Sequence, residues 1–159
     1  INGIPVEFNI PGVNPGVIFT GVTPLDIEFT KKPNCAENSQ WSLFEDNKIE
    51  ETYVGIGGPG NHPGQQMLSG MFRIQKYGPQ KYNSYKLVFC PDASSTCSNI
   101  GRYDNEEGGR RLVLTQDRPY EVIFVNAYNR DATIKSVSNG TLIWFVELRR
   151  DERLGEWES

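Results

Sequence analysis

The sequence predicts an all-β protein, and three observations support this fold class. The chain of 159 residues contains 16 glycines and 10 prolines, which interrupt it at short and fairly even intervals. The segments between these turn formers are short and rich in β-branched and aromatic residues, as in the strands of sandwiches and barrels. No segment repeats its apolar residues with the period of a helix.

The expected strands follow one another along most of the chain. Leu25–Phe29 gives the clearest signal, because its apolar residues alternate with Asp26 and Glu28, which is the pattern of a half-buried strand. A glycine- and proline-rich loop is expected over Gly57–Gly64. The expected strands are, in order, Ile4–Phe8, Val17–Phe19, Leu25–Phe29, Trp41–Phe44, Tyr53–Ile56, Met71–Gln75, Tyr85–Cys90, Arg111–Thr115 and Glu121–Val125.

The sequence changes character after Ala127. A linker is expected at Tyr128–Asp131, and a hairpin within Thr133–Val146, because an Asn-Gly pair at Asn139 is a strong short-range turn signal. Asn139 also begins an Asn-Gly-Thr sequon, which makes it a glycosylation candidate if the protein is secreted. The charged run Arg149–Arg153 is interpreted as a solvated end.

The charge balance and the hydropathy of the chain exclude some classes of partner. Lys and Arg number 16 and Asp and Glu 20, which gives a net charge of −4. This acidity argues against nucleic acid, whose phosphates require a basic surface. No run of 18 apolar residues is present, so no membrane-spanning segment is expected. The first residues lack the charged start and apolar stretch of a signal peptide, so either a removed leader or a missing beginning is expected.

The three cysteines are Cys35, Cys90 and Cys97. Cys90 and Cys97 flank a short segment of turn-forming residues, and a disulfide between them would contribute roughly 2–3 kcal/mol through chain entropy. The alternative is a pair of reduced thiols. Cys35 is then left as a free thiol or bonded to a partner elsewhere. Zinc is not expected, because His62 is the only histidine and lies far from the cysteine pair.

No residue pattern points to catalysis. His62 lies in a Pro/Gly-rich loop with no Gly-x-Ser-x-Gly context for a nucleophile, so it is interpreted as a solvent-exposed loop histidine. The acidic pairs that begin at Glu50 and Glu106 are not expected to act as the two carboxylates of a glycosidase. Adjacent residues point to opposite faces of a strand, and in a loop they are usually solvated. Trp41 is expected to pack in the core rather than to stack on a sugar. We therefore expect a protein that is not an enzyme and that uses no metal or cofactor.

Six motifs stand in one order along the chain at compatible spacing. They are Pro24–Phe29, Asn34–Trp41, Gly70–Ile74, Tyr85–Pro91, Cys97–Gly101 and Gly109–Leu114. Together they resemble the Kunitz-type soybean trypsin inhibitor family of plants, with the inhibitors of legume seeds as the most similar members. The resemblance extends from about Ile4 to Ala127.

The resemblance implies a β-trefoil, a six-strand barrel capped by three hairpins, over residues 1–127, with residues 128–159 as an unmatched C-terminal extension. It also implies the Cys90–Cys97 disulfide. The first of the three trefoil units, which carries the usual partner of Cys35, has no counterpart before Ile1. The missing unit could lie on another piece of the protein, come from a second molecule, or be replaced by the extension. The first explanation is preferred, because the extension is short for four strands.

The function implied by the resemblance is that of a protease inhibitor, secreted or vacuolar in seeds, whose rigid exposed loop enters a protease active site like a substrate. Serine proteases are favoured, with cysteine proteases as a second class. Alignment from Ile4–Phe8 places the loop at Asn9–Gly16, with Val13 in the specificity pocket. If the family pattern is instead aligned backward from Pro24, the residue that fills the specificity pocket is at about Pro15. The expected protease-binding residues are Gly12, Val13, Asn14 and Pro15.

The expected loop lacks a cation. No Lys or Arg occurs from Ile1 to Thr30, so the buried carboxylate of a trypsin pocket would stay unpaired. Val13 suits an elastase-like pocket better, or the loop is inactive. The alternative function is a seed storage or carbohydrate-binding β-trefoil protein that has lost inhibitory activity.

Overall fold

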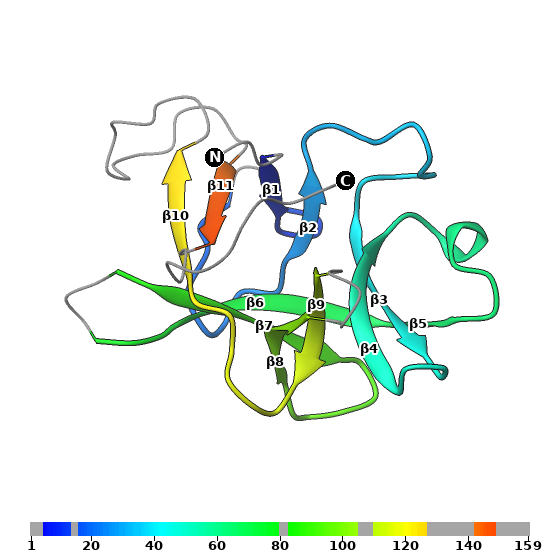
Figure 1. Ribbon diagram of the computed structural model, residues 1–159. Helices are drawn as coiled ribbons and strands as arrows, with labels where there is room; N and C mark the ends of the chain where they lie inside the picture. Colours follow the sequence, from blue (N-terminus) through cyan, green and yellow to red (C-terminus); the bar gives the residue numbers. More distant parts are fainter. Residues whose placement is uncertain (1–4, 14–15, 80–82, 105–109, 127–141, 149–159) are drawn as a thin grey trace.

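The structure is a computed structural model that describes residues 5–13, 16–79, 83–104, 110–126 and 142–148. Strands make up almost all of its regular structure, which confirms the predicted all-β class (Figure 1). A single turn of 3-10 helix, η1, lies within the loop expected at Gly57–Gly64. The elements of the described residues are β1 (Val6–Asn9), β2 (Asp26–Phe29), β3 (Trp41–Asp46), β4 (Glu51–Ile56), η1 (Pro59–Asn61), β5 (Gln66–Leu68), β6 (Gly70–Lys76), β7 (Tyr85–Pro91), β8 (Ser98–Asp104), β9 (Arg110–Thr115), β10 (Val122–Asn126) and β11 (Leu142–Leu148).

Three differences from the predicted strands have a physical cause. Val17–Phe19 is not a strand, because it pairs with no strand among the described residues and runs into a turn that begins at Phe19. β8 was not predicted, because its sequence is largely polar. Its six-residue register with β9, from Asn99–Thr115 to Asp104–Arg110, makes it a strand. β5 is short and pairs only with β3, at the end of the strand order.

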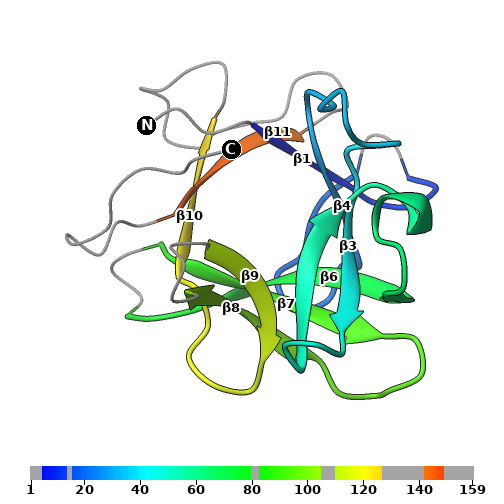
Figure 2. The same cartoon turned by 45° about the vertical axis from the view of Figure 1, so that its right-hand side comes forward.

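The strands form one antiparallel sheet in the order β2-β1-β11-β10-β7-β8-β9-β4-β3-β5, with β6 paired to β7. Two isolated bridges, Leu25–Phe72 and Glu28–Gln40, join the β2 end of this order to β6 and to the segment before β3. In Figure 1, β10, β11, β1 and β2 lie above the long hairpin of β6 and β7, and β3, β4 and β5 lie to its right. Figure 2 shows the strands surrounding a common interior. The two bridges therefore connect the β2 end of the sheet back to β6 and to the start of β3.

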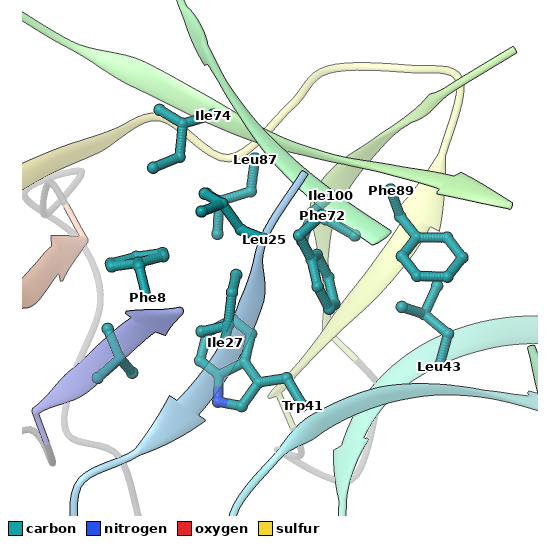
Figure 3. Packing of buried hydrophobic residues seen from close by; sticks show 11 residues of the cluster. Phe8, Leu25, Ile27, Trp41, Leu43, Phe72, Ile74, Leu87, Phe89 and Ile100 are labelled. Carbon is teal, nitrogen blue, oxygen red and sulfur yellow. The ribbon is translucent and has the colours of Figure 1, made fainter. Parts of the chain in front are cut away.

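Side chains alternate between inward and outward along the strands, and the inward-facing ones form the core. Trp41 is 8% exposed, as predicted, and its ring lies edge-on between Phe29 and Phe72, with centroids 5.6 and 6.4 Å away. Phe89 continues this row, 5.2 Å from Phe72. The residues of the main cluster, most of them labelled in Figure 3, are Val6, Phe8, Leu25, Ile27, Trp41, Leu43, Phe72, Ile74, Leu87, Phe89 and Ile100.

A disulfide joins Cys90 to Cys97 and closes the connection between β7 and β8. Closing so short a loop stabilises the fold by roughly 2–3 kcal/mol in the chain-entropy account. Cys35 is exposed and its thiol is free.

The described part of the extension, residues 142–148, is the strand β11 of the sheet. β11 pairs with β1 through Val6–Trp144, Glu7–Ile143 and Phe8–Leu142, and with β10 on its other side from Val122–Leu148 to Asn126–Trp144. β11 therefore lies between β1 and β10 and pairs with the edges of both strands that would otherwise stay open. The rest of the extension, including the hairpin turn expected at Asn139 and the charged run Arg149–Arg153, lies outside the described residues.

Two carboxylates face each other on the outer side of the first strand pair. Glu7 on β1 lies opposite Glu28 on β2, while the neighbouring Val6 and Phe8 point into the core. Burial raises the pKa of the Glu7 carboxyl above its usual 4.5, and the charge of Glu28 raises this pKa further. Because the raised pKa means that the ionised form is disfavoured in the folded state, Glu7 lowers stability at neutral pH. This cost disappears as the pH falls below about 4.5.

We expect Glu7→Gln to raise the free energy of unfolding at pH 7 by about 0.2–1 kcal/mol, the cost of a like-charge pair across two strands. Urea denaturation at pH 7 and at pH 3 measures this gain, which should shrink at the lower pH. Glu45→Gln is the matched control, because Glu45 lies opposite the uncharged Thr52 and Gln66. Equal gains at both pH values, or a gain in the control, would contradict the assignment.

Candidate functional site

The connection between β1 and β2 carries the residues that the sequence singles out. Residues 10–25 include no charged side chain, although 23% of the whole chain is charged. The connection contains two tight turns, one at Ile10–Val13 and one at Phe19–Thr23. Asn14 and Pro15, two of the four expected protease-binding residues, lie outside the described residues.

The first turn projects from the end of β1. The Val13 amide donates to the Ile10 carbonyl at 3.1 Å. Pro11 occupies the second position and Gly12, with a φ of 72°, the third, which is the pattern of a type II turn. Both are exposed, as is the Val13 side chain, which is 52% exposed. Gly12 and Val13 therefore lie at the exposed tip of a small turn.

The second turn is held more firmly than the first. The Phe19 carbonyl accepts hydrogen bonds from the amides of Val22 at 3.2 Å and Thr23 at 3.0 Å. The Phe19 amide donates back to the Thr23 hydroxyl at 2.7 Å, and Thr23 itself is buried. Gly21 has a φ of 77°, which favours glycine even though a Cβ there would meet no atom within 4 Å. Its amide donates to the Ile74 carbonyl of β6 at 2.6 Å.

The base of the connection is anchored to the barrel on both sides. Leu25 and Phe72 exchange backbone hydrogen bonds of 2.8 and 3.1 Å, and both side chains are buried in the core. At the other end, the side-chain amide of Asn9 donates a hydrogen bond to Glu28 Oε1 at 2.8 Å, which ties the end of β1 to β2. The connection therefore leaves and re-enters the barrel at fixed points.

Large exposed hydrophobic residues gather on this connection. Of those in the described residues, four belong to it and two, Ile49 and Met67, lie elsewhere. The four are Val13 (52% exposed), Phe19 (63%), Val17 (67%) and Val22 (68%). The last three were not predicted as site residues. A sixteen-residue uncharged stretch at a turn-rich position is the sequence signal that could have found them.

The remaining predicted residues lie apart from this connection. Cys90 and Cys97 are joined at the β7–β8 connection. The Cys35 carbonyl accepts a hydrogen bond from the Asn61 side chain at 2.9 Å, which ties it to η1. Asn139, the glycosylation candidate, lies outside the described residues.

His62 is not the solvent-exposed histidine that was expected. Its ring is half-buried and stacks on Phe44 with centroids 3.7 Å apart. Nε2 lies 2.8 Å from the Ile56 carbonyl and Nδ1 lies 3.0 Å from the Tyr53 hydroxyl. The loop of Pro59–Gly64 folds back over β3 and β4, and this long-range contact is invisible to a local reading of the sequence. His62 is a packing residue here.

Tyr53 is the centre of this polar group. Its hydroxyl donates to Gln65, whose amide donates to Asp46 at 3.2 Å, and the Arg111 guanidinium lies 4.9 Å above its ring. Burial raises the pKa of the phenol above its usual 10, while the Gln65 hydrogen bond and the Arg111 charge lower it in part. The neutral phenol is therefore the form that the fold stabilises.

Two searches of the described part of the chain give negative findings. None of its helices is long and apolar enough to cross a membrane. Within the same residues, no group of three or more His, Cys, Asp or Glu side chains could hold a metal ion.

Sequence comparison finds one matching family and close relatives. The profile of the legume Kunitz family, described as trypsin and protease inhibitor, matches residues 1–126. The chain is 56% identical over 137 residues to the Kunitz-type trypsin inhibitor-like 2 protein of Pisum sativum, covering 86% of this chain and 62% of that protein. It is 57% identical over 136 residues to subtilisin inhibitor CLSI-II of Canavalia lineata, covering 86% and 70%. The chain thus spans less than two thirds of the length of the pea protein.

Structure comparison confirms the β-trefoil. MP-4 from Mucuna pruriens matches with a TM-score of 0.74 and 68% identity over 80% of this chain and 70% of that one. The soybean trypsin inhibitor, solved in complex with porcine pancreatic trypsin, matches with a TM-score of 0.60 and 29% identity over 75% and 66%. The strand arrangement described above is the β-trefoil of these structures.

We expect Tyr53→Phe to lower the free energy of unfolding at pH 7 by about 1–2 kcal/mol, because it leaves Gln65 and His62 without a hydroxyl partner. In the wild type, stability should be independent of this phenol below pH 10 and should fall as the pH rises above 10, where the unfolded state ionises first. Urea denaturation at pH 7 and pH 11 measures both effects. The variant should lose less stability between the two pH values.

Tyr103→Phe serves as the control, because its ring packs against the same small cluster of Phe44, Tyr53 and Val113. An equal alkaline loss in wild type and Tyr53→Phe would show that the Tyr53 phenol is not the group responsible.

Proposed function

The chain belongs to the legume Kunitz family of trypsin and protease inhibitors, and from this membership we propose that it inhibits a serine protease by binding the active site like a substrate. The two relatives aligned above carry the names of a trypsin inhibitor-like protein and a subtilisin inhibitor, and trypsin and subtilisin are both serine proteases. The soybean relative was solved bound to trypsin. Cysteine proteases are a second target class. The chain is proposed to act by binding, not as an enzyme.

The exposed turn at the end of β1 carries this proposal. A substrate-like inhibitor gains affinity when its contact segment is already ordered in the free protein, because less conformational entropy is lost on binding. Ile10–Val13 meets this condition through its own hydrogen bond, its proline and its glycine, and it presents Val13 outward. We assign the protease contact to Gly12, Val13, Asn14 and Pro15.

The target that fits this turn has a small, apolar specificity pocket. A trypsin pocket presents a buried carboxylate, and a valine would leave it unpaired at a cost of about 1–3 kcal/mol or more. Val13 has the size and polarity for an elastase-like pocket. The same absence of a cation also favours the second candidate, a seed storage or carbohydrate-binding β-trefoil that has lost inhibitory activity.

The proposed setting is that of the legume relatives, in a secreted or vacuolar compartment of the seed. The Cys90–Cys97 disulfide is consistent with an oxidising compartment. Cys35 is exposed and free, so its thiol is accessible to a cysteine on a separate N-terminal segment, and we propose such a segment as a partner.

We expect the wild-type chain to inhibit elastase or subtilisin more strongly than trypsin, and Val13→Arg to create trypsin inhibition by pairing with the pocket carboxylate. A gain of about 1–3 kcal/mol corresponds to about 5- to 150-fold in the inhibition constant. Steady-state inhibition of the three enzymes measures it. Pro15→Arg, made in parallel, distinguishes the two alignments of the loop.

Ile49→Arg is the matched control, because Ile49 is also exposed but lies in the turn between β3 and β4. If neither loop variant inhibits trypsin, the loop assignment is wrong. If the wild type inhibits none of these enzymes and papain is also unaffected, the storage or carbohydrate-binding function is favoured.

The proposed partner of Cys35 is tested by the intact mass of the protein purified from its natural source, before and after reduction. A mass above that of the 159 residues that falls on reduction, with release of a separate peptide, is the expected result. A mass unchanged by reduction, apart from the two hydrogen atoms gained by the Cys90–Cys97 pair, would contradict it.

A further inference from the structure

We propose that the hydrogen bonds that anchor the loop after β4 form a proton-binding site, and that this site makes the docking of the loop depend on pH. The hydrogen bonds run in one chain, called the His62 chain below, through Ile56, His62, Tyr53, Gln65 and Asp46. Every link of this chain is filled only when His62 carries a hydrogen on both ring nitrogens. The inference concerns residues outside the β1–β2 connection and does not rest on the proposed inhibitory function.

The direction of the hydrogen bond is fixed at the histidine end of the His62 chain. Nε2 of His62 lies 2.8 Å from the carbonyl oxygen of Ile56. A backbone carbonyl can only accept a hydrogen bond, so Nε2 must carry a hydrogen. In a neutral histidine the other ring nitrogen, Nδ1, then has no hydrogen and can act only as an acceptor.

The direction is also fixed at the aspartate end. The side-chain amide nitrogen of Gln65 lies 3.2 Å from Oδ2 of Asp46 and donates to this carboxylate. The amide oxygen of Gln65 therefore faces the Tyr53 hydroxyl, and this oxygen can only accept. The single hydroxyl hydrogen of Tyr53 is used in this bond. Burial raises the pKa of this phenol above its usual 10, so the hydrogen stays in place at neutral pH.

The two directions meet at the Tyr53 oxygen and leave one link without a hydrogen. This oxygen lies 3.0 Å from Nδ1 of His62, and its own hydrogen is already donated to Gln65. With a neutral His62, a lone pair of the oxygen and the lone pair of Nδ1 would therefore face each other. A proton taken up from solvent by Nδ1 fills the link and converts the ring to an imidazolium. His62 then donates from both nitrogens, to Ile56 and to Tyr53.

The packing of the ring restricts any movement of His62 away from this contact. The ring stacks on Phe44 with centroids 3.7 Å apart. The backbone of β4 also passes close by, since a Cβ at Gly55 would lie 3.0 Å from Cε1 of His62. Within the loop, the Gln65 amide donates to the His62 carbonyl at 3.2 Å. Loss of the proton must therefore break a link of the His62 chain or loosen the loop from the barrel.

The charges around the His62 chain favour a bound proton. The ionisable groups that face it come from the segment before β3 and from β3, β4, β8 and β9. They are the carboxylates of Glu37, Asp46 and Glu51, the guanidinium of Arg111 and the phenols of Tyr53 and Tyr103. Arg111, which lies 4.9 Å above the Tyr53 ring, opposes a second positive charge, whereas the three carboxylates stabilise it.

The loop that the His62 chain anchors is also bonded to the segment of the free cysteine. The Asn61 side chain donates to the Cys35 carbonyl at 2.9 Å and accepts from the Glu37 amide at 3.1 Å. A proton on His62 therefore stabilises the positions of two segments, the loop and the segment before β3.

The first test is nitrogen-15 NMR of the full chain, in which His62 is the only histidine and gives unique ring signals. We expect both ring nitrogens to carry hydrogen in most folded molecules at pH 7. In the chain unfolded in urea, most of these rings should be neutral at the same pH, because the ordinary pKa of histidine is about 6.5. A neutral ring in the folded chain, with hydrogen on Nε2 alone, would overturn the proposal.

The second test is urea denaturation between pH 8 and pH 6. A folded state that binds a proton more tightly than the unfolded state becomes more stable as the pH falls, and this stability is lost as the pH rises. We expect the folding equilibrium constant of the wild type to increase by about three- to tenfold over this range. Tyr53→Phe removes the hydroxyl that requires the second hydrogen and should lose this increase. His62→Gln, which cannot take up a proton, should lose it as well.

Glu7→Gln is the matched control, because it removes a distant carboxyl whose pKa is raised by burial and should keep the increase. An equal increase in the wild type and in Tyr53→Phe would show that the His62 chain does not bind the proton. If the folded wild type takes up a proton while its His62 ring stays neutral, the proton lies on Asp46 and the assignment to His62 is wrong.

Discussion

The reciprocal backbone pair between Leu25 and Phe72 is the contact on which the rest of the structure depends. Its two hydrogen bonds, of 2.8 and 3.1 Å, join the start of β2 to β6, and the side chains of both residues enter the main core. Besides this bridge, β2 pairs with β1 and is bonded to the segment before β3, through the bridge to Gln40 and the Phe29 amide, which donates to the Ser39 carbonyl. A sheet closes into a barrel only if its edges are paired, and this pair joins the β2 end of the strand order to β6.

The same contact decides what the β1–β2 connection can do. The connection leaves β1 and returns to a fixed point at Leu25, and its described residues form two turns, at Ile10–Val13 and at Phe19–Thr23. The two turns are supported differently. Ile10–Val13 relies on its own proline, glycine and one hydrogen bond, whereas Phe19–Thr23 is also tied to β6 through Gly21. A hydrogen-bonded turn that exposes apolar side chains and carries no charge has the properties of a binding segment, in which rigidity and exposed apolar area act together.

The polar group around Tyr53 shows how polar side chains are accommodated elsewhere in the barrel. Phe44, Tyr53 and Val113 form a small second cluster, over which His62, Gln65 and Asp46 build a chain of hydrogen bonds. Buried polar groups are tolerated when each has a partner, and here the partners come from β3, β4 and the loop that follows them. The histidine that looks like a surface residue in the sequence is thereby part of the packing.

The sequence by itself determined the strand class, the family resemblance, the disulfide candidates and the absence of a cation in the expected loop. These depend on local patterns: the alternation in Leu25–Phe29, the spacing of Cys90 and Cys97, and the order of the motifs. Only the tertiary structure decided that Ile18 faces inward while Phe19 faces outward, that His62 is half-buried, and that β11 pairs with β1 and β10. Each of these depends on contacts between residues far apart in the chain, and local periodicity carries no information about which distant segment covers a side chain.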